Sequence, residues 1–233
     1  MGWPLPCSVC VRSGLFVFGS AVVILVVGVL VGLLLAKVAS HDVIGRTDTH
    51  VERWFAAHRT NDLNQATHYA TDAAETPMIA ALAVLTAAGA ALAWRRWREP
   101  MLVAVAVTGE VLIFVTIALL VDRPRPPVGH LDMAPPTSSF PSGHTAAAVA
   151  LYGVWALLAW QRSRSTLLRG LLTLLAIAVP IAVALSRMYR GMHYPTDVLA
   201  GALLGTAWLA ATVRTGQQAN SRGRARHRRG APR

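Results

Sequence analysis

The chain has 233 residues, 54% of them hydrophobic, and a mean hydropathy of +0.46. This composition is too apolar for a water-soluble domain of that length and indicates one membrane domain. The formal net charge of +11 would suggest nucleic-acid binding in a soluble protein. Because much of the excess lies between Arg222 and Arg233, we expect no nucleic acid but a basic tail that contacts anionic lipid headgroups.

The first long apolar segment covers residues 15–36. At about 1.5 Å per residue it spans roughly 33 Å, enough to cross a hydrocarbon core of about 30 Å. It is longer than the core of a cleaved signal peptide, which predicts a retained transmembrane helix after an N-terminal segment, residues 1–14. Cys7 and Cys10 form a C-x-x-C pattern there without a second pair, so we interpret them as incidental thiols rather than a zinc site.

Residues 37–75 are polar and contain one amphipathic pattern. Thr49 and Glu52 match a capping box, and apolar side chains follow at helical spacing. We therefore expect an amphipathic helix on the membrane surface. The histidines of this segment share no common spacing and predict no metal site; they are His41, His50, His58 and His68.

Further apolar segments are long enough to cross the membrane. They cover residues 77–94, 101–121, 143–160, 167–185 and 196–213. The expected fold is all-α, with six transmembrane helices within residues 15–213 and a basic tail without regular structure in residues 214–233. Gly201 and Gly205 form a G-x-x-x-G pattern, which predicts a close helix-packing face in the last span.

Charge asymmetry predicts the orientation in the membrane. Six spans place both termini on one side, and this side carries 14 of the 22 lysine and arginine residues. The positive-inside rule then assigns both termini to the cytoplasm. The loops between the third and fourth and the fifth and sixth spans are expected on the outer face. Lys37 is the only lysine, an arginine bias that hints at a GC-rich bacterial genome and hence at an inner membrane.

Polar motifs stand at the ends of these apolar segments. The first follows the third span, the second opens the fourth, and the third separates the fifth from the sixth. In order, they are Arg123-Pro124-Arg125-Pro126, then Pro141-Ser142-Gly143-His144, and finally Ser186-Arg187 with His193 and Asp197.

The residue types in these motifs suit phosphoryl transfer. Arg125 and Arg187 offer planar guanidinium groups for phosphate oxygens, and Ser186 adds a hydroxyl donor. Ser142 and Gly143 are expected where a helix begins, so backbone N–H groups there can bind an anion.

The histidines supply the reactive groups. Pro195 suits a first helical position, so Asp197 falls in the first turn and can reach back to His193. A carboxylate that accepts from one ring nitrogen leaves the other basic, which makes His193 a candidate nucleophile or base. His144 is a candidate proton donor for the leaving oxygen. These three side chains beside two arginines would make a poor cation site, so no metal is expected.

Together the motifs resemble the signature of the type 2 phosphatidic acid phosphatase superfamily, K-x6-R-P, P-S-G-H and S-R-x5-H-x3-D. The second and third motifs match in full, and the resemblance covers about residues 110–205. The first motif lacks its lysine. Counting back from Arg125, Ala118 takes the lysine position, and counting back from Arg123, Thr116 takes it.

The resemblance implies a membrane phosphatase that uses neither metal nor cofactor and forms a phosphohistidine. By motif position, His193 attacks phosphorus, His144 assists departure of the leaving group, and Asp197 orients His193. The phosphate-binding positions fall on Arg125, Ser142, Gly143 and Arg187, and Arg123 is a candidate substitute for the missing lysine.

The implied substrates are lipid phosphates in the bilayer: phosphatidic acid, phosphatidylglycerol phosphate or polyprenyl diphosphate. The last is slightly favoured for an outward-facing bacterial enzyme. A phosphotransferase that uses the same phosphohistidine, and a non-catalytic lipid-phosphate binder, remain as alternatives.

Five further residues have open interpretations. Glu110 and Asp122 are intramembrane or interfacial acids, and Glu110 serves either helix pairing or site support. Asp132 and its neighbour His130 are candidates for headgroup contact. Arg190 is interpreted as an interfacial side chain.

Overall fold

The computed structural model describes residues 8–37 and 42–229. Within these residues the chain is helical and contains no strand. The pair Cys7 and Cys10 lies partly outside the described residues, as do the ends of the N-terminal segment and of the basic tail.

The described residues form eight helices. Their bounds are α1 Ser8–Lys37, α2 Val43–Ala57, α3 Asn61–Asp72, α4 Thr76–Trp94, α5 Arg98–Leu120, α6 Gly143–Arg162, α7 Thr166–Tyr189 and α8 Pro195–Arg229.

Six of these helices, α1 and α4 to α8, are long and apolar enough to cross a membrane. This confirms the predicted all-α, six-span fold, and the expected spans agree with the membrane-spanning parts of these helices to within a few residues. The prediction for the tail differs from the structure, because α8 continues to Arg229. Alanine, glutamine and arginine favour helix and no proline interrupts residues 214–229, so nothing in the local sequence ends the helix at the membrane surface.

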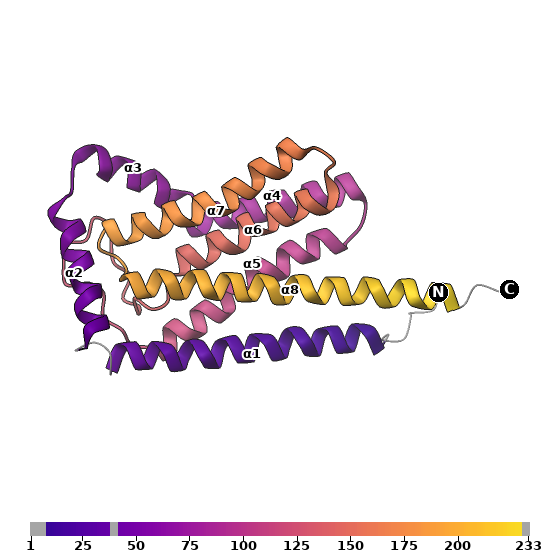
Figure 1. Ribbon diagram of the computed structural model, residues 1–233, viewed down its shortest axis with the longest axis horizontal. Coiled ribbons are helices and arrows are strands. Elements are labelled where there is room, and N and C mark those ends of the chain that lie inside the picture. The colour runs from indigo at the N-terminus through magenta and orange to yellow at the C-terminus, as the bar shows by residue number, and fades with distance from the viewer. Residues whose placement is uncertain (1–7, 38–41, 230–233) are drawn as a thin grey trace.

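The helix α6 lies at the centre of the bundle, in contact with α4, α5, α7 and α8. The helices α1 and α8 pack side by side along one edge (Figure 1). The start of α1 and the end of α8 lie at one end of the molecule. The helices α2 and α3 and the loop from α5 to α6 lie at the other end (Figure 1).

The polar segment before α4 forms two helices rather than the single one expected. The helix α2 begins at Val43, so Thr49 lies inside it and donates to the carbonyl of Gly45. The predicted capping box at Thr49 and Glu52 was therefore wrong, because the start of α2 lies six residues earlier and Glu52 is buried on its inner face. The helix α2 crosses the end of the bundle and contacts α7 and α8 (Figure 1).

The glycines at 201 and 205 allow α8 to approach α6 closely, as predicted. A Cβ atom at Gly201 would collide with the carbonyl of Ser142, and one at Gly205 would meet the carbonyl of Ala146 at 2.7 Å. This contact holds the start of α6 against the start of α8. It brings the second and third motifs together at the α2 end of the bundle.

Candidate active site

His193 is held rigidly by a backbone hydrogen bond. Its Nδ1 lies 2.7 Å from the carbonyl oxygen of Ser139. Since a carbonyl only accepts, Nδ1 carries the proton and the lone pair is at Nε2. Burial lowers the pKa of His193, the nearby Asp197 carboxylate opposes this shift, and the charge of Arg187 adds to it. The ring is therefore neutral at neutral pH, with a free nucleophilic nitrogen.

The turn after α7 sets the position of this ring. Gly191 has a φ of 76°, which glycine adopts without strain. Its N–H donates to Met188 O at 2.9 Å, and the N–H of Met192 donates to Arg187 O at 3.0 Å. These bonds form a Schellman motif that ends α7 and reverses the chain. As a result His193 lies directly beside the last turn of α7, which carries Arg187.

Asp197 falls in the first turn of α8, because the helix starts at Pro195 as predicted. Its Oδ2 accepts from the backbone N–H of Tyr194 at 3.0 Å and lies 3.8 Å from His193 Nδ1. That separation is too long for a hydrogen bond. The predicted acceptor for the His193 ring is thus replaced by the carbonyl of Ser139, and Asp197 acts on the imidazole as a nearby charge.

Arg123 belongs to the support of Asp197. Its Nη1 donates to Asp197 Oδ1 and to Thr196 Oγ1, and its Nη2 donates to Asp48 Oδ2 at 2.7 Å. The guanidinium also lies over the ring of Tyr194, 4.5 Å from its centroid. Both terminal nitrogens are engaged by protein groups, which leaves Arg123 little capacity to bind phosphate.

Arg125 and Arg187 each have a side-chain donor that no described protein group accepts from. Arg125 donates through Nη1 to Met192 O at 2.8 Å, and Arg187 donates through Nη1 to Asp132 Oδ2 at 2.9 Å. The Nε atoms of both arginines are buried and have no hydrogen-bond partner among the described residues. A buried donor without an acceptor lowers the stability of the fold. Such donors are expected where a site binds an anion.

Asp132 fastens the α5–α6 loop to the end of α7. Its carboxylate accepts from Arg187 and, at 2.9 Å to each oxygen, from Nε of Arg190. Burial raises the pKa of Asp132, but the hydrogen bonds from Arg190 and the charges of both arginines outweigh this effect and leave the pKa lowered. Arg190 is buried in this contact and is not the interfacial side chain that we expected.

The second motif opens α6, with Ser142 at its N-cap position. The backbone N–H of Ser142 donates to Asp197 O at 3.0 Å, and its hydroxyl exchanges a hydrogen bond with Thr145 at 3.0 Å. Gly143 and His144 follow in the first turn, where backbone N–H groups have no intrahelical partner. His144 lies within electrostatic range of Arg125, Arg187 and His193.

Ser186 is not brought to these residues. Its hydroxyl lies 2.6 Å from that of Thr71 and 2.5 Å from the carbonyl of Thr67, both in α3. It fastens α3 to α7. Ala118 lies in the last turns of α5, and Glu110, in the same helix, is buried with no hydrogen-bond partner among the described residues.

The motifs did not reveal two other side chains. Asp48 of α2 contacts Arg123, and Glu75 at the start of α4 lies 3.3 Å from His144 Nε2. Both belong to the polar segment before the motifs. The only signal for Asp48 is that Glu52 follows it four residues later, on the same helix face.

Comparisons with known proteins identify the family and the fold. The family profile of the PAP2 superfamily matches residues 99–221. No curated protein sequence matches the chain significantly. Among solved structures, the transmembrane PAP2 type phosphatidylglycerolphosphate phosphatase from Bacillus subtilis is similar with a TM-score of 0.73 and 23% identity, over 85% of this chain and 96% of that one.

LpxE from Aquifex aeolicus is also similar, with a TM-score of 0.56 and 21% identity over 72% of this chain and 95% of that one. At these identities both likenesses concern the fold. The family match covers more than half of the chain and contains all three motifs. The chain is therefore a member of the PAP2 superfamily, with its membrane phosphatase fold.

Proposed function

We propose that this protein hydrolyses lipid phosphates through a phosphohistidine on His193, without a metal ion. One observation carries the proposal: a buried, neutral imidazole with its proton fixed at Nδ1 stands beside two arginines with unused buried donors. Such a site offers a nucleophile together with positive charge for the equatorial phosphate oxygens.

In the first step, His193 Nε2 attacks phosphorus while Arg125, Arg187 and the N–H groups at Gly143 hold the phosphate oxygens. The P–N bond forms as the bond to the lipid oxygen breaks, and His144 gives a proton to that oxygen. The phosphorylated imidazolium is positively charged, and the Asp197 carboxylate stabilises it. In the second step His144 takes a proton from water, and the water oxygen attacks phosphorus. The P–N bond breaks, so that phosphate leaves and the lone pair returns to His193 Nε2.

Lipid phosphates suit the position of the site. The motifs lie at the ends of membrane-spanning helices, where headgroups are already concentrated. The substrate classes proposed are polyprenyl diphosphate, phosphatidic acid and phosphatidylglycerol phosphate. The similar Bacillus subtilis structure is described as a phosphatidylglycerolphosphate phosphatase, which supports this range.

The test is phosphate release by the purified protein from a panel of these lipids in mixed micelles. We expect release from at least one lipid in the presence of EDTA, and little from water-soluble sugar phosphates. Recovery of the labelled phosphate as inorganic phosphate identifies a hydrolase. Transfer of the label to an added alcohol would instead identify a phosphotransferase. Release that EDTA stops and magnesium restores would overturn the metal-independent mechanism.

We also propose that the site faces outward, and a cysteine placed at Met133 tests this orientation. Met133 lies in the α5–α6 loop and is 98% exposed, whereas Trp97, at the opposite end of the bundle, is 79% exposed. With Cys7 and Cys10 changed to serine, Met133→Cys should react with an impermeant maleimide in intact cells. Trp97→Cys should react only after lysis. The reverse pattern would place the site in the cytoplasm.

A further inference from the structure

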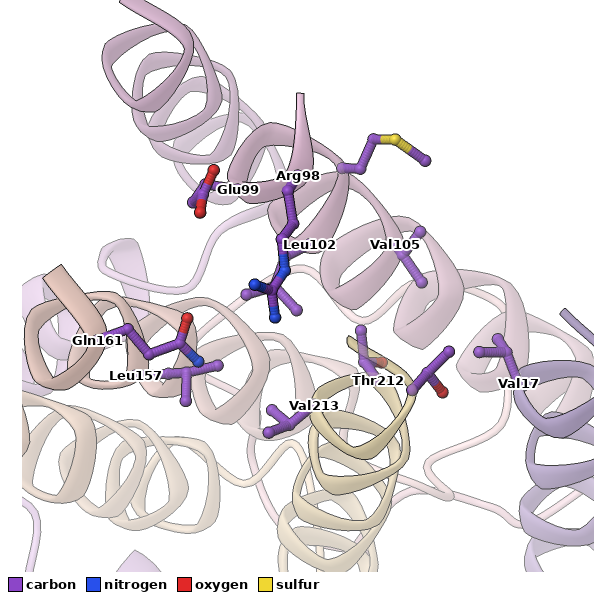
Figure 2. Close-up of a pocket in the computed structure, with 11 residues that line it drawn as sticks. Val17, Arg98, Glu99, Leu102, Val105, Leu157, Gln161, Thr212 and Val213 are labelled. Carbon is purple, nitrogen blue, oxygen red and sulfur yellow. The ribbon is translucent and has the colours of Figure 1, made fainter. Parts of the chain in front are cut away.

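A cavity lies at the end of the bundle away from the motifs. It has a volume of about 180 Å³ and is bounded by α1, α5, α6 and α8 (Figure 2). Figure 2 shows the guanidinium of Arg98 reaching into this space toward Leu157 and Gln161 of α6, while the carboxylate of Glu99 points away from it. None of the residues that line it belongs to the three motifs.

The cavity lies where the membrane spans end. The helix α5 begins at Arg98, and the apolar part of α8 ends at Thr215. Its lining is mostly apolar. The apolar residues are Val17, Met101, Leu102, Val105, Leu157 and Val213, and the polar ones are Arg98, Glu99, Gln161, Thr212 and Thr215. The hydroxyls of Thr212 and Thr215 donate to the carbonyls of Trp208 and Ala211 in their own helix, so the lining side chains that can donate to a headgroup are those of Arg98 and Gln161. An apolar lining with these donors at the end of the spans matches an amphiphile at headgroup depth.

The positive charge at this end of the bundle favours an anionic headgroup. Around the turns from α4 to α5 and from α6 to α7, the described chain carries several arginines but only one acid, Glu99. Glu99 is 2% exposed and already paired with Arg162. The arginines at this end are Arg95, Arg96, Arg98, Arg162, Arg164, Arg169 and Arg214. The surrounding field therefore attracts a negatively charged group and repels a cationic one.

We propose that this cavity binds an anionic phospholipid from the leaflet opposite the catalytic site. Its phosphate contacts Arg98 and the side-chain amide of Gln161, and one acyl chain lies against Val17 and Val105. The lipid joins α1 and α8 to the start of α5 and stabilises the folded bundle by mass action. This inference depends on the membrane fold and not on the proposed phosphatase activity.

The test is the affinity of the detergent-purified protein for phosphatidylglycerol and for phosphatidylcholine, measured by native mass spectrometry. We expect Arg98→Gln to weaken phosphatidylglycerol binding about 10-fold or more, since a charge-assisted hydrogen bond is lost. Arg164→Gln removes the same charge from an exposed position outside the cavity and should change binding less than about twofold. Val105→Phe narrows the cavity without changing charge and should also weaken binding.

Two further arms separate the alternatives. Arg187→Gln should retain this lipid, because Arg187 belongs to the catalytic end of the bundle. Glycerol phosphate, which has the charged group without the chains, should fail to compete at the concentrations at which the lipid binds. Equal losses for Arg98→Gln and Arg164→Gln, or equal affinity for the two lipids, would reduce the effect to general surface attraction and overturn the proposal.

Discussion

Replacing His193 by alanine is expected to abolish phosphate release, by at least about 10⁴-fold, because no other group takes over attack on phosphorus. The ring is fixed by Ser139 O with Nε2 as the only nitrogen that bears a lone pair. Rapid quench with labelled lipid phosphate should trap a phosphoenzyme in the wild type that is labile in acid and stable in base. The variant should trap none.

His144 acts on a different atom and should behave differently. His144→Ala removes the proton donor to the leaving oxygen, a contribution of about 10²–10⁴-fold. An activated aryl phosphate needs little protonation of its leaving group, so this variant should recover most of its activity with such a substrate, whereas His193→Ala should not. Glu75 lies 3.3 Å from His144. We expect it to orient that ring, so replacing Glu75 should lower activity only with substrates that depend on His144.

His130→Ala is the matched control. His130 lies in the α5–α6 loop, and among the described residues its ring bonds to the carbonyl of Pro126, at 3.1 Å, so its removal should leave turnover near that of the wild type. Normal turnover in His193→Ala, or a phosphoenzyme that survives acid, would contradict the phosphohistidine mechanism.

Those parts of the molecule that depend on local pattern were predictable. Long apolar runs predicted the six spans because a bilayer imposes both length and composition on a helix. Pro195 predicted the start of α8 and hence the place of Asp197, because proline suits a first helical turn. The spacing of Gly201 and Gly205 predicted the close contact that joins the motifs.

The contacts that depend on tertiary packing were not predictable. The acceptor for His193 is a backbone carbonyl, and every residue has one, so no side-chain pattern marks Ser139. Ser186 belongs to a matching motif, yet its hydroxyl faces α3 because that helix folds back on α7. The polar segment before α4 gave no sign that α2 would carry Asp48 to Arg123, since the two are 75 residues apart.

Replacing Asp48 is expected to have the second large effect on activity, because Asp48 binds Arg123 and Arg123 binds Asp197. Its Oδ2 accepts from Arg123 and its Oδ1 accepts from the backbone N–H of Thr196 at 3.2 Å. Both carboxylates of the Asp48–Arg123–Asp197 chain are buried, so each charge depends on its neighbour. Without Asp48, we expect Arg123 to interact more strongly with Asp197 and to weaken the electrostatic effect of Asp197 on the His193 ring.

Glu52 provides an internal control on the same helix. It is fully buried one turn after Asp48, and burial, together with the charges of Asp197 and Asp48, raises its pKa to about 9. At neutral pH it is therefore protonated and uncharged. Glu52→Gln imitates that state and should leave activity close to that of the wild type.

Asp48→Asn should lower kcat about 10–100-fold with a much smaller change in KM, since a charge-assisted hydrogen bond of about 1.5–3 kcal/mol is lost behind the nucleophile rather than at the phosphate. Combining it with Arg123→Gln should cost little more than Arg123→Gln alone, because the two side chains act through one contact. Measured kcat and KM for the two single variants, the double variant and Glu52→Gln test whether Asp48 positions Asp197 through Arg123. Full additivity in the double variant, or an equal loss in Glu52→Gln, would show that α2 serves the fold alone and does not position Asp197.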